Sequence, residues 1–153
     1  MPDGLHIHVS VSEQTLTLHD GDAVLRSYPV STSKFGIGTE EGSFKTPLGR
    51  FSVCEKFGDG EPPLTIFRSR LAEGLWSPDD PTDADLVLTR ILRLDGLDAD
   101  NANTYERYIY IHGTNHEDMI GTPASQGCVR MHNDHVLDLH DRTPLGTPVS
   151  IHA

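Results

Sequence analysis

Apolar and polar residues alternate strictly near the start of the chain. In LHIHVSV, residues 5–11, every second side chain is apolar, and TLTLH, residues 15–19, repeats the pattern. Because successive side chains of a strand point to opposite faces, this period indicates two half-buried strands. The residues DGD at 20–22 favour a tight turn into AVLRSYPV, residues 23–30. Residues 5–30 therefore predict a β-meander.

Later apolar stretches predict more strands. RFSVCEKF, LVLTRILRL, RYIYIHG and VSIH have the length and apolar content of strands, and they occupy residues 50–57, 86–94, 107–113 and 149–152. We therefore expect roughly six or seven strands in all. Two segments are expected to be irregular, namely the glycine-rich loop 31–49 and the acidic span 58–85. The first is long for a loop, which is typical of functional loops.

One helix is expected near the C-terminus. Asn133 or Asp134 is a suitable N-cap residue, because the side-chain oxygen of either can accept a hydrogen bond from a free backbone N–H. Val136, Leu137 and Leu139 follow and are expected to face inward. The prolines and glycine of TPLGTPV then end the helix. The chain is thus predicted to be mostly β, with one helix.

Composition narrows the class of protein. The length of 153 residues fits one domain of ordinary size, so we expect a single domain over residues 1–153. The net charge of −11 disfavours nucleic acid and anionic membranes as partners, and no cluster of Lys and Arg offsets it. No stretch approaches the roughly 18 consecutive apolar residues of a membrane span. The opening residues lack a basic region and an apolar run, so they predict no secretory signal.

The two cysteines differ in their surroundings. Cys54 is out of phase with the apolar positions of its predicted strand and is interpreted as a structural thiol. Cys128 follows Gly127, and His112 ends the apolar run YIYI. A free thiol with a pKa of about 8.5 is mostly protonated at neutral pH, so a nearby imidazole would activate it. A cysteine near a histidine is by itself a weak signal, and a disulfide between the two cysteines also stays open.

Three motifs carry a resemblance to a known family. HGTNHEDMIGTPASQGCVRMHNDHVLDL, residues 112–139, resembles the signature of the L,D-transpeptidase catalytic domain, the YkuD-type family. GSFKTPLGRF at 42–51 and PLGTPVSI at 144–151 resemble two other segments of that family. The resemblance implies a β-sandwich-like fold of mixed sheets with one or two short helices. It also implies a cysteine nucleophile that attacks a peptidoglycan stem peptide, releases D-alanine and passes the acyl group to an amine.

The resemblance assigns roles residue by residue. It implies that Cys128 is the nucleophile, that His112 is the general base, and that the backbone carbonyl of Gly113 orients the imidazole. Oxyanion N–H donors would come from Gln126, Gly127 and Cys128 itself. The resemblance also implies substrate-binding or loop-shaping roles for three residues: Ser125, Arg130 and Tyr110. The family often has histidine where this chain has Gln126, which leaves any role for a second histidine open.

Other interpretations of the sequence remain possible at this stage. The same site would also suit an L,D-carboxypeptidase, in which water accepts the acyl group, and a non-catalytic wall-binding module is a further alternative. The nine histidines invite a metal site, but no HExxH or paired CxxC motif is present, so neither a metal nor a cofactor is expected. The acidic stretch SPDDPTDAD is expected to be a solvated loop. Oligomeric state and location stay unassigned, since the family works outside the inner membrane and no export signal is visible here.

Overall fold

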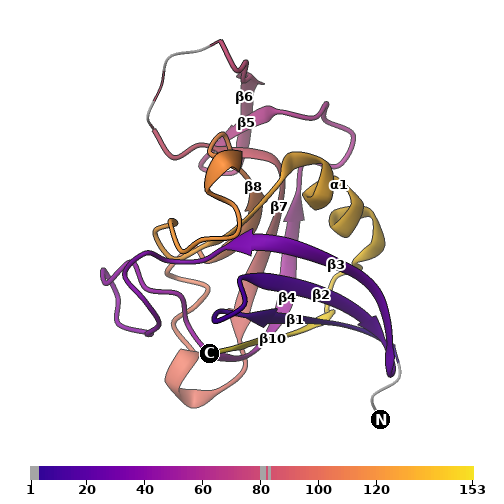
Figure 1. Ribbon diagram of the computed structural model, residues 1–153, viewed down its shortest axis with the longest axis vertical. Helices are drawn as coiled ribbons and strands as arrows, with labels where there is room; N and C mark the ends of the chain where they lie inside the picture. Colours follow the sequence, from indigo (N-terminus) through magenta and orange to yellow (C-terminus); the bar gives the residue numbers. More distant parts are fainter. Residues whose placement is uncertain (1–3, 80–81, 83) are drawn as a thin grey trace.

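The computed structural model describes residues 4–79, 82 and 84–153. Figure 1 shows a twisted β-structure with a single α-helix packed against it, α1 (Asn133–Arg142). Two short 3₁₀ turns are η1 (Ala99–Asn101) and η2 (Glu117–Met119). Within the described residues the strands number ten: β1 (Leu5–Ser10), β2 (Thr15–Asp20), β3 (Ala23–Ser31), β4 (Gly49–Phe57), β5 (Thr65–Arg68), β6 (Leu71–Leu75), β7 (Val87–Gly96), β8 (Tyr110–Gly113), β9 (Val129–Met131) and β10 (Pro148–His152).

Eight of these strands close into a barrel. Their order is β4-β10-β1-β2-β3-β9-β8-β7, and β7 pairs back onto β4. Two neighbouring pairs are parallel, β1 with β10 and β8 with β9, and the other pairs are antiparallel. The β5–β6 hairpin extends the sheet outward from β7. The expectation of a mostly β fold with mixed sheets and few helices is confirmed, and closure leaves no free edge within the eight-stranded barrel itself.

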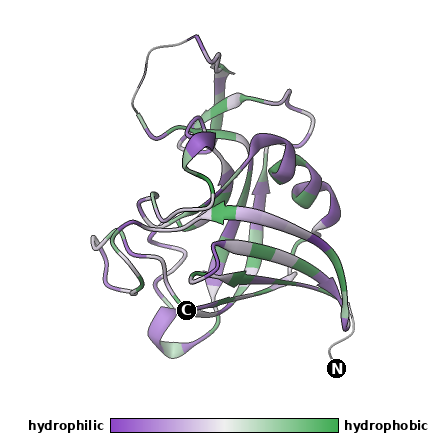
Figure 2. Cartoon of the chain, in the orientation of Figure 1, coloured by the Kyte–Doolittle hydropathy of each residue, from purple (hydrophilic) through white to green (hydrophobic). Residues whose placement is uncertain are grey.

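The barrel interior is filled by the apolar positions that the alternation predicted. Ile7 and Val9 of β1 and Leu16 and Leu18 of β2 are fully buried. Figure 2 shows the resulting change between hydrophobic and hydrophilic residues along the strands. Val136 and Leu139 of α1 join the same core. The strands that carry the candidate site are therefore held by the main core of the barrel.

Several local predictions were wrong. The span 58–85 contains the β5–β6 hairpin; all five residues of β6 are exposed, and its sequence LAEGL lacks the strict apolar–polar alternation of a half-buried strand. Strand β9 was missed because three residues are too short for a periodic pattern. The segment 107–113 is a strand only from Tyr110, because Tyr108 has a left-handed backbone with φ of 56°. The count of six or seven strands was consequently too low.

The helix begins at Asn133, so its N-cap lies one residue before the first predicted cap position. The N-cap residue is His132 rather than Asn133 or Asp134, and its side chain makes no capping hydrogen bond. Leu137 is only half-buried, whereas Val136 and Leu139 point inward as expected. Across the part of the chain that is described, no helix has both the length and the apolar character that crossing a bilayer requires.

Candidate active site

The candidate residues meet on one face of β8 and β9. These strands are parallel, with Ile111 opposite Val129 and His112 opposite Arg130. Ile111 and Val129 are fully buried in the main core, so the alternate residues of both strands face the other way. Cys128 directly precedes β9 and lies beside Tyr110. The thiol and the His112 imidazole therefore share a face. Their backbone positions are offset by two residues, about 6.6 Å, along the strand direction.

The Cys128 sulfur contacts two backbone groups of the segment that leads into β8. The Tyr110 N–H donates to Sγ at 3.3 Å, and the thiol donates to the Tyr108 carbonyl at 3.4 Å. Desolvation of the sulfur raises the pKa of the thiol to about 11, which the Tyr110 N–H partly opposes. The negative charge of Asp85 raises this pKa further, while the charge of Arg130 lowers it. The resting group is therefore a thiol rather than a thiolate.

His112 is held as a neutral imidazole. Its side chain is almost fully enclosed, with 2% exposure, and Nδ1 is 2.5 Å from the Gly113 carbonyl oxygen. Because a carbonyl only accepts, Nδ1 carries the proton and Nε2 is left with the free lone pair. Burial lowers the pKa of His112, an effect that Asp85 and the Gly113 hydrogen bond partly offset. The pair at rest is thus thiol and imidazole, both uncharged.

Asn133 explains why residue 113 is a glycine. A Cβ on Gly113 would collide with Asn133 Oδ1 and would lie 2.6 Å from the Leu88 carbonyl oxygen. The Asn133 side chain donates to the Thr114 carbonyl at 2.8 Å and accepts from the Thr89 hydroxyl at 2.6 Å. These bonds tie the end of β8 to β7 and α1, which holds the carbonyl that orients His112. The sequence suggested only a capping role for Asn133, and no local signal indicated this one.

The loop before Cys128 is braced by its own hydrogen bonds. The buried Ser125 hydroxyl donates to the Cys128 carbonyl at 2.6 Å, and the Gly127 N–H donates to Ser125 Oγ at 3.3 Å. Gln126 is exposed between them. The N–H of Gly127 therefore donates within the loop at rest. To stabilise an oxyanion, this N–H would have to turn away from Ser125 Oγ or donate to both oxygens. Ser125 acts on the shape of the loop.

The backbone conformation at position 127 requires a glycine. Its φ of 119° lies in the region that favours glycine. A Cβ there would reach the Lys45 carbonyl oxygen at 3.4 Å and Ile109 Cδ1 at 3.5 Å. The space beside Gly127 is thus taken by the long loop 32–48 between β3 and β4 and not left open to a substrate. Arg107 holds that loop in place by donating to the Lys45 carbonyl at 2.7 Å.

Arg130 forms a buried ion pair that the sequence did not predict. Its Nη2 lies 2.9 Å from Asp85 Oδ2, and the Arg130 side chain is only 4% exposed. Asn115 holds the same segment by accepting from the Leu86 N–H and donating to the Ala84 carbonyl. The charge of Arg130 is therefore committed to Asp85, and a direct bond to a substrate carboxylate would have to compete with this pair.

The acidic stretch that contains Asp85 was expected to be a solvated loop. Ala84 and Asp85 are exposed, but the Asp85 carboxylate faces the buried Arg130. Residues 80, 81 and 83 of this stretch lie outside the described residues. A buried arginine needs a partner, yet nothing in the sequence indicates which of the many carboxylates supplies it.

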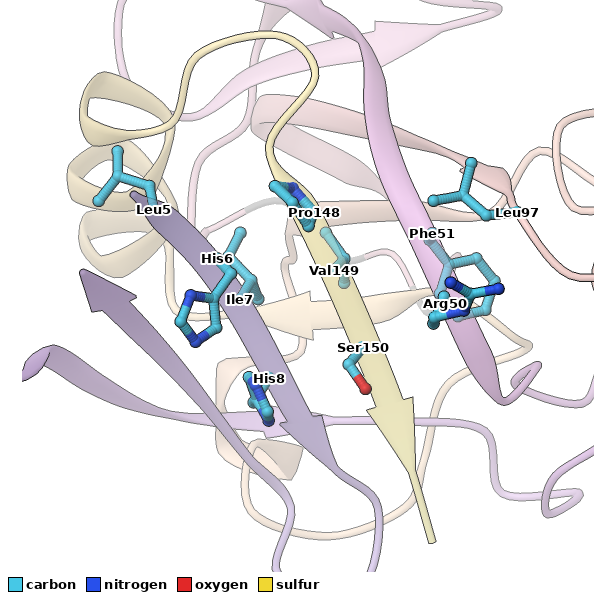
Figure 3. Close-up of a pocket in the computed structure, with 10 residues that line it drawn as sticks. All are labelled: Leu5, His6, Ile7, His8, Arg50, Phe51, Leu97, Pro148, Val149 and Ser150. Atoms are coloured by element: carbon cyan, nitrogen blue, oxygen red, sulfur yellow. The ribbon is translucent and has the colours of Figure 1, made fainter. Parts of the chain in front are cut away.

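The histidines fall into separate groups. His132 lies 3.5 Å from Glu117 and its ring contacts that of His135. A second group of four lies on the outside of β1, β2 and β10: His6, His8, His19 and His152. His6 and His8 line a groove of about 540 Å³ with Leu97 and Arg50 (Figure 3). Among the described residues, no group of three or more His, Cys, Asp or Glu side chains could hold a metal ion.

That groove is remote from the thiol. It lies over β1, β10 and β4, which occupy the opposite wall of the barrel from β8 and β9. The face that carries Cys128 and His112 is instead bordered by the 32–48 loop, the Tyr108 turn and the β5–β6 hairpin. A cysteine just before β9 and a backbone-oriented histidine on the parallel strand β8 are the residue types that a cysteine acyl-transfer site requires.

Comparison with known proteins identifies the family. Residues 4–151 match YkuD, the L,D-transpeptidase catalytic domain, and the chain belongs to this family. Bacillus subtilis YqjB is 39% identical over 117 residues, which cover 76% of this chain and 57% of YqjB. Bacillus subtilis YkuD is 28% identical over 146 residues, which cover 95% of this chain and 65% of YkuD. Both are named only provisionally as L,D-transpeptidases, and the chain spans less than two thirds of either.

Solved structures share the fold. An L,D-transpeptidase from Xylanimonas cellulosilytica superimposes with a TM-score of 0.66 at 21% identity, covering 99% of this chain and 62% of that one. L,D-transpeptidase 3 from Mycobacterium tuberculosis, solved with a faropenem-derived adduct, gives a TM-score of 0.63 at 16% identity, covering 97% and 60%. At these identities the likeness establishes the barrel with its helix as the L,D-transpeptidase fold.

Proposed function

We propose that residues 1–153 form the single catalytic domain of a cysteine-dependent L,D-transpeptidase that acts on peptidoglycan stem peptides. The observation that carries the proposal is the shared face of Cys128 and His112, with Nδ1 of the imidazole bound to the Gly113 carbonyl. This arrangement leaves Nε2 as the base for the thiol. Membership of the YkuD family supports the choice of substrate.

The reaction begins with transfer of one proton. His112 Nε2 takes the proton of the Cys128 thiol as Sγ attacks the carbonyl carbon that precedes the terminal D-alanine. A carbon–sulfur bond forms, and the carbonyl oxygen becomes an oxyanion. Backbone N–H groups of Gln126, Gly127 and Cys128 are the donors for this charge. The imidazolium then gives its proton to the amine of D-alanine as the peptide bond breaks.

The second half of the reaction regenerates the thiol. An acceptor amine attacks the thioester carbon, and His112 removes a proton from the attacking nitrogen. The new amide bond forms as the carbon–sulfur bond breaks, and the proton returns to sulfur. Tyr110 lies next to Cys128 and would contact the bound stem. Ser125 keeps the loop in shape, and Arg130 contributes through its pairing with Asp85.

The decisive experiment is incubation of the chain with a synthetic tetrapeptide stem. We expect release of D-alanine by the wild type and by Cys54→Ala, and none by Cys128→Ala. Comparison of the products with and without an acceptor amine separates transfer from hydrolysis, which would indicate the carboxypeptidase alternative. Unchanged release by Cys128→Ala would contradict the proposal, whereas stem binding without any turnover would favour a wall-binding module.

A covalent probe gives an independent measurement. Faropenem is expected to add one adduct mass to the wild type and to Cys54→Ala, because the strained lactam carbonyl acylates the nucleophile. Peptide mapping should place the adduct on Cys128. An adduct of equal yield on the folded Cys128→Ala variant would show that another residue is the nucleophile.

A further inference from the structure

The proposed donor poses a problem of charge, and the inference below rests on the proposed function. The stem ends in D-alanine, whose free carboxylate lies one residue beyond the attacked carbonyl. One residue spans about 3.3–3.6 Å, so this carboxylate must come close to the Cys128 thiol. The chain has a net charge of −11 and would repel it. A cation beside the thiol is therefore needed to select a stem with a free C-terminus.

Three arginines near the thiol are already engaged. Arg130 pairs with Asp85 at 2.9 Å, and Arg93 pairs with Glu55 at 3.0 Å. Arg107 donates both to the Lys45 carbonyl at 2.7 Å and to the Gly38 carbonyl at 3.3 Å. Each of these guanidinium groups holds a part of the fold. A ligand carboxylate would have to break an existing contact to reach any of them.

Arg70 differs from the other three. Its Nη1 donates to the Tyr110 hydroxyl at 3.1 Å, and its Cζ lies 5.3 Å from the centre of the Tyr108 ring. No carboxylate among the described residues forms an ion pair with it. Its two partners are the residues whose backbones touch the Cys128 sulfur. The guanidinium is therefore linked to the thiol through both tyrosines, and no carboxylate of the described residues neutralises its charge.

The backbone that presents Arg70 is strained. Arg68 pairs with Leu71 across the β5–β6 hairpin, so Ser69 and Arg70 are the two turn residues. Their φ values of 50° and 67° give a type I′ turn, which normally takes Asn-Gly. Tyr108, which is 52% exposed beneath the guanidinium, also has a positive φ of 56°. Strained backbone of this kind clusters at ligand sites, where the surrounding structure holds it.

We infer that Arg70, supported on the Tyr108 ring and the Tyr110 hydroxyl, binds the C-terminal carboxylate of the donor stem peptide. The guanidinium has further N–H donors besides the one given to Tyr110, and they suit a two-pronged bond to a carboxylate. Arg70 is in this sense a specificity-determining residue. It makes a stem that ends in a free acid a better donor than one that continues or is amidated.

The test compares two tetrapeptide donors that differ only in their last group, D-alanine or D-alanine amide. For the wild type, kcat/KM should favour the acid. Arg70→Gln should lower this acid-to-amide ratio by about tenfold, because one charge-assisted contact is lost. Arg68→Gln is the matched control. It removes an arginine from the same hairpin, whose partner is Glu73 at 2.8 Å, and should leave the ratio unchanged.

A second variant separates recognition from folding. Arg70→Gly gives the turn a residue suited to positive φ, so the melting temperature should stay the same or rise by about 3 °C. The acid-to-amide ratio should nevertheless fall as it does in Arg70→Gln. A purely structural role for Arg70 predicts the reverse, namely a lower melting temperature and an unchanged ratio. An unchanged ratio in both folded variants overturns the inference.

Binding to an inactive chain distinguishes this inference from the proposed function. In the Cys128→Ala background, the acid should bind more tightly than the amide, and adding Arg70→Gln should remove the difference. If the wild type turns over neither donor but this binding difference depends on Arg70, the proposed function fails and the carboxylate site stands. If turnover occurs and the two peptides bind equally well to Cys128→Ala, the carboxylate site fails and the enzyme stands.

Discussion

The resting state of Cys128 leads to a quantitative prediction. Burial raises the pKa of its thiol from 9.0 to about 11. A difference of this size disfavours the thiolate by about 3 kcal/mol. At neutral pH only about one molecule in ten thousand would carry the thiolate, compared with about one in a hundred for an unperturbed thiol. The free protein should therefore react slowly with an alkylating agent, because that reaction needs the thiolate to form first.

The assay is the rate of iodoacetamide alkylation between pH 6 and 11. A Cys54→Ala background leaves one thiol, and mass spectrometry of the intact chain gives the modified fraction at each time. We expect the rate to rise about tenfold for each pH unit until close to pH 11, without a plateau near neutrality. Acylation by faropenem should be much faster at pH 7, because its carbonyl can react while His112 takes the proton.

A plateau in alkylation below pH 8 would refute this reasoning. It would mean that Cys128 and His112 already form a thiolate–imidazolium pair in the free protein. The same measurement on His112→Gln provides the control. Loss of the imidazole should reduce acylation by faropenem strongly, yet it should leave the slow alkylation at high pH close to that of the parent.

Three further predictions concern the supports of the site. Gly113→Ala forces a Cβ against Asn133 and should destabilise the fold by about 2 kcal/mol, measured by urea unfolding, with loss of D-alanine release. Asp85→Asn leaves Arg130 as a buried cation without its partner and should cost about 3 kcal/mol by the same measurement. Burial lowers the pKa of His140 to about 4, so the unfolded chain binds the proton more readily than the folded chain. The contribution of His140 to the free energy of unfolding should therefore be complete above about pH 6.5. It should fall by up to about 3 kcal/mol as the pH is lowered towards 4.

Each of these expectations has a clear contrary result. Wild-type stability of Gly113→Ala would show that Asn133 can move aside at no cost. Equal stability of Asp85→Asn and Asp79→Asn, a control on the same acidic stretch, would show that the Arg130 pair is not needed. If His140→Leu loses stability between pH 6.5 and 4 as steeply as the wild type, then His140 is not the source of the acid sensitivity.

Much of the fold could be predicted from local patterns, whereas the hairpin could not. The alternation in β1 and β2 identified their buried faces, because side-chain direction along a strand depends only on sequence period. Strand β6 exposes every residue, its two leucines included, and is held by pairing with β5, so its apolar residues do not mark a buried face. The Ser69-Arg70 turn likewise lacks the glycine that would have announced it.

The sequence by itself determined which residues were candidates: a cysteine after a glycine, a histidine at the end of an apolar run, and the motifs around them. It also determined which faces of the strands are buried. Only the tertiary structure decided the state of each charge. Arg130 is committed to Asp85, whereas Arg70 lies beside Tyr110 without an ion pair to any described carboxylate, although the sequence favoured Arg130 for binding substrate. The reason is physical: burial and ion pairing depend on segments far apart in the chain, and only the folded barrel with its attached hairpin brings those segments together.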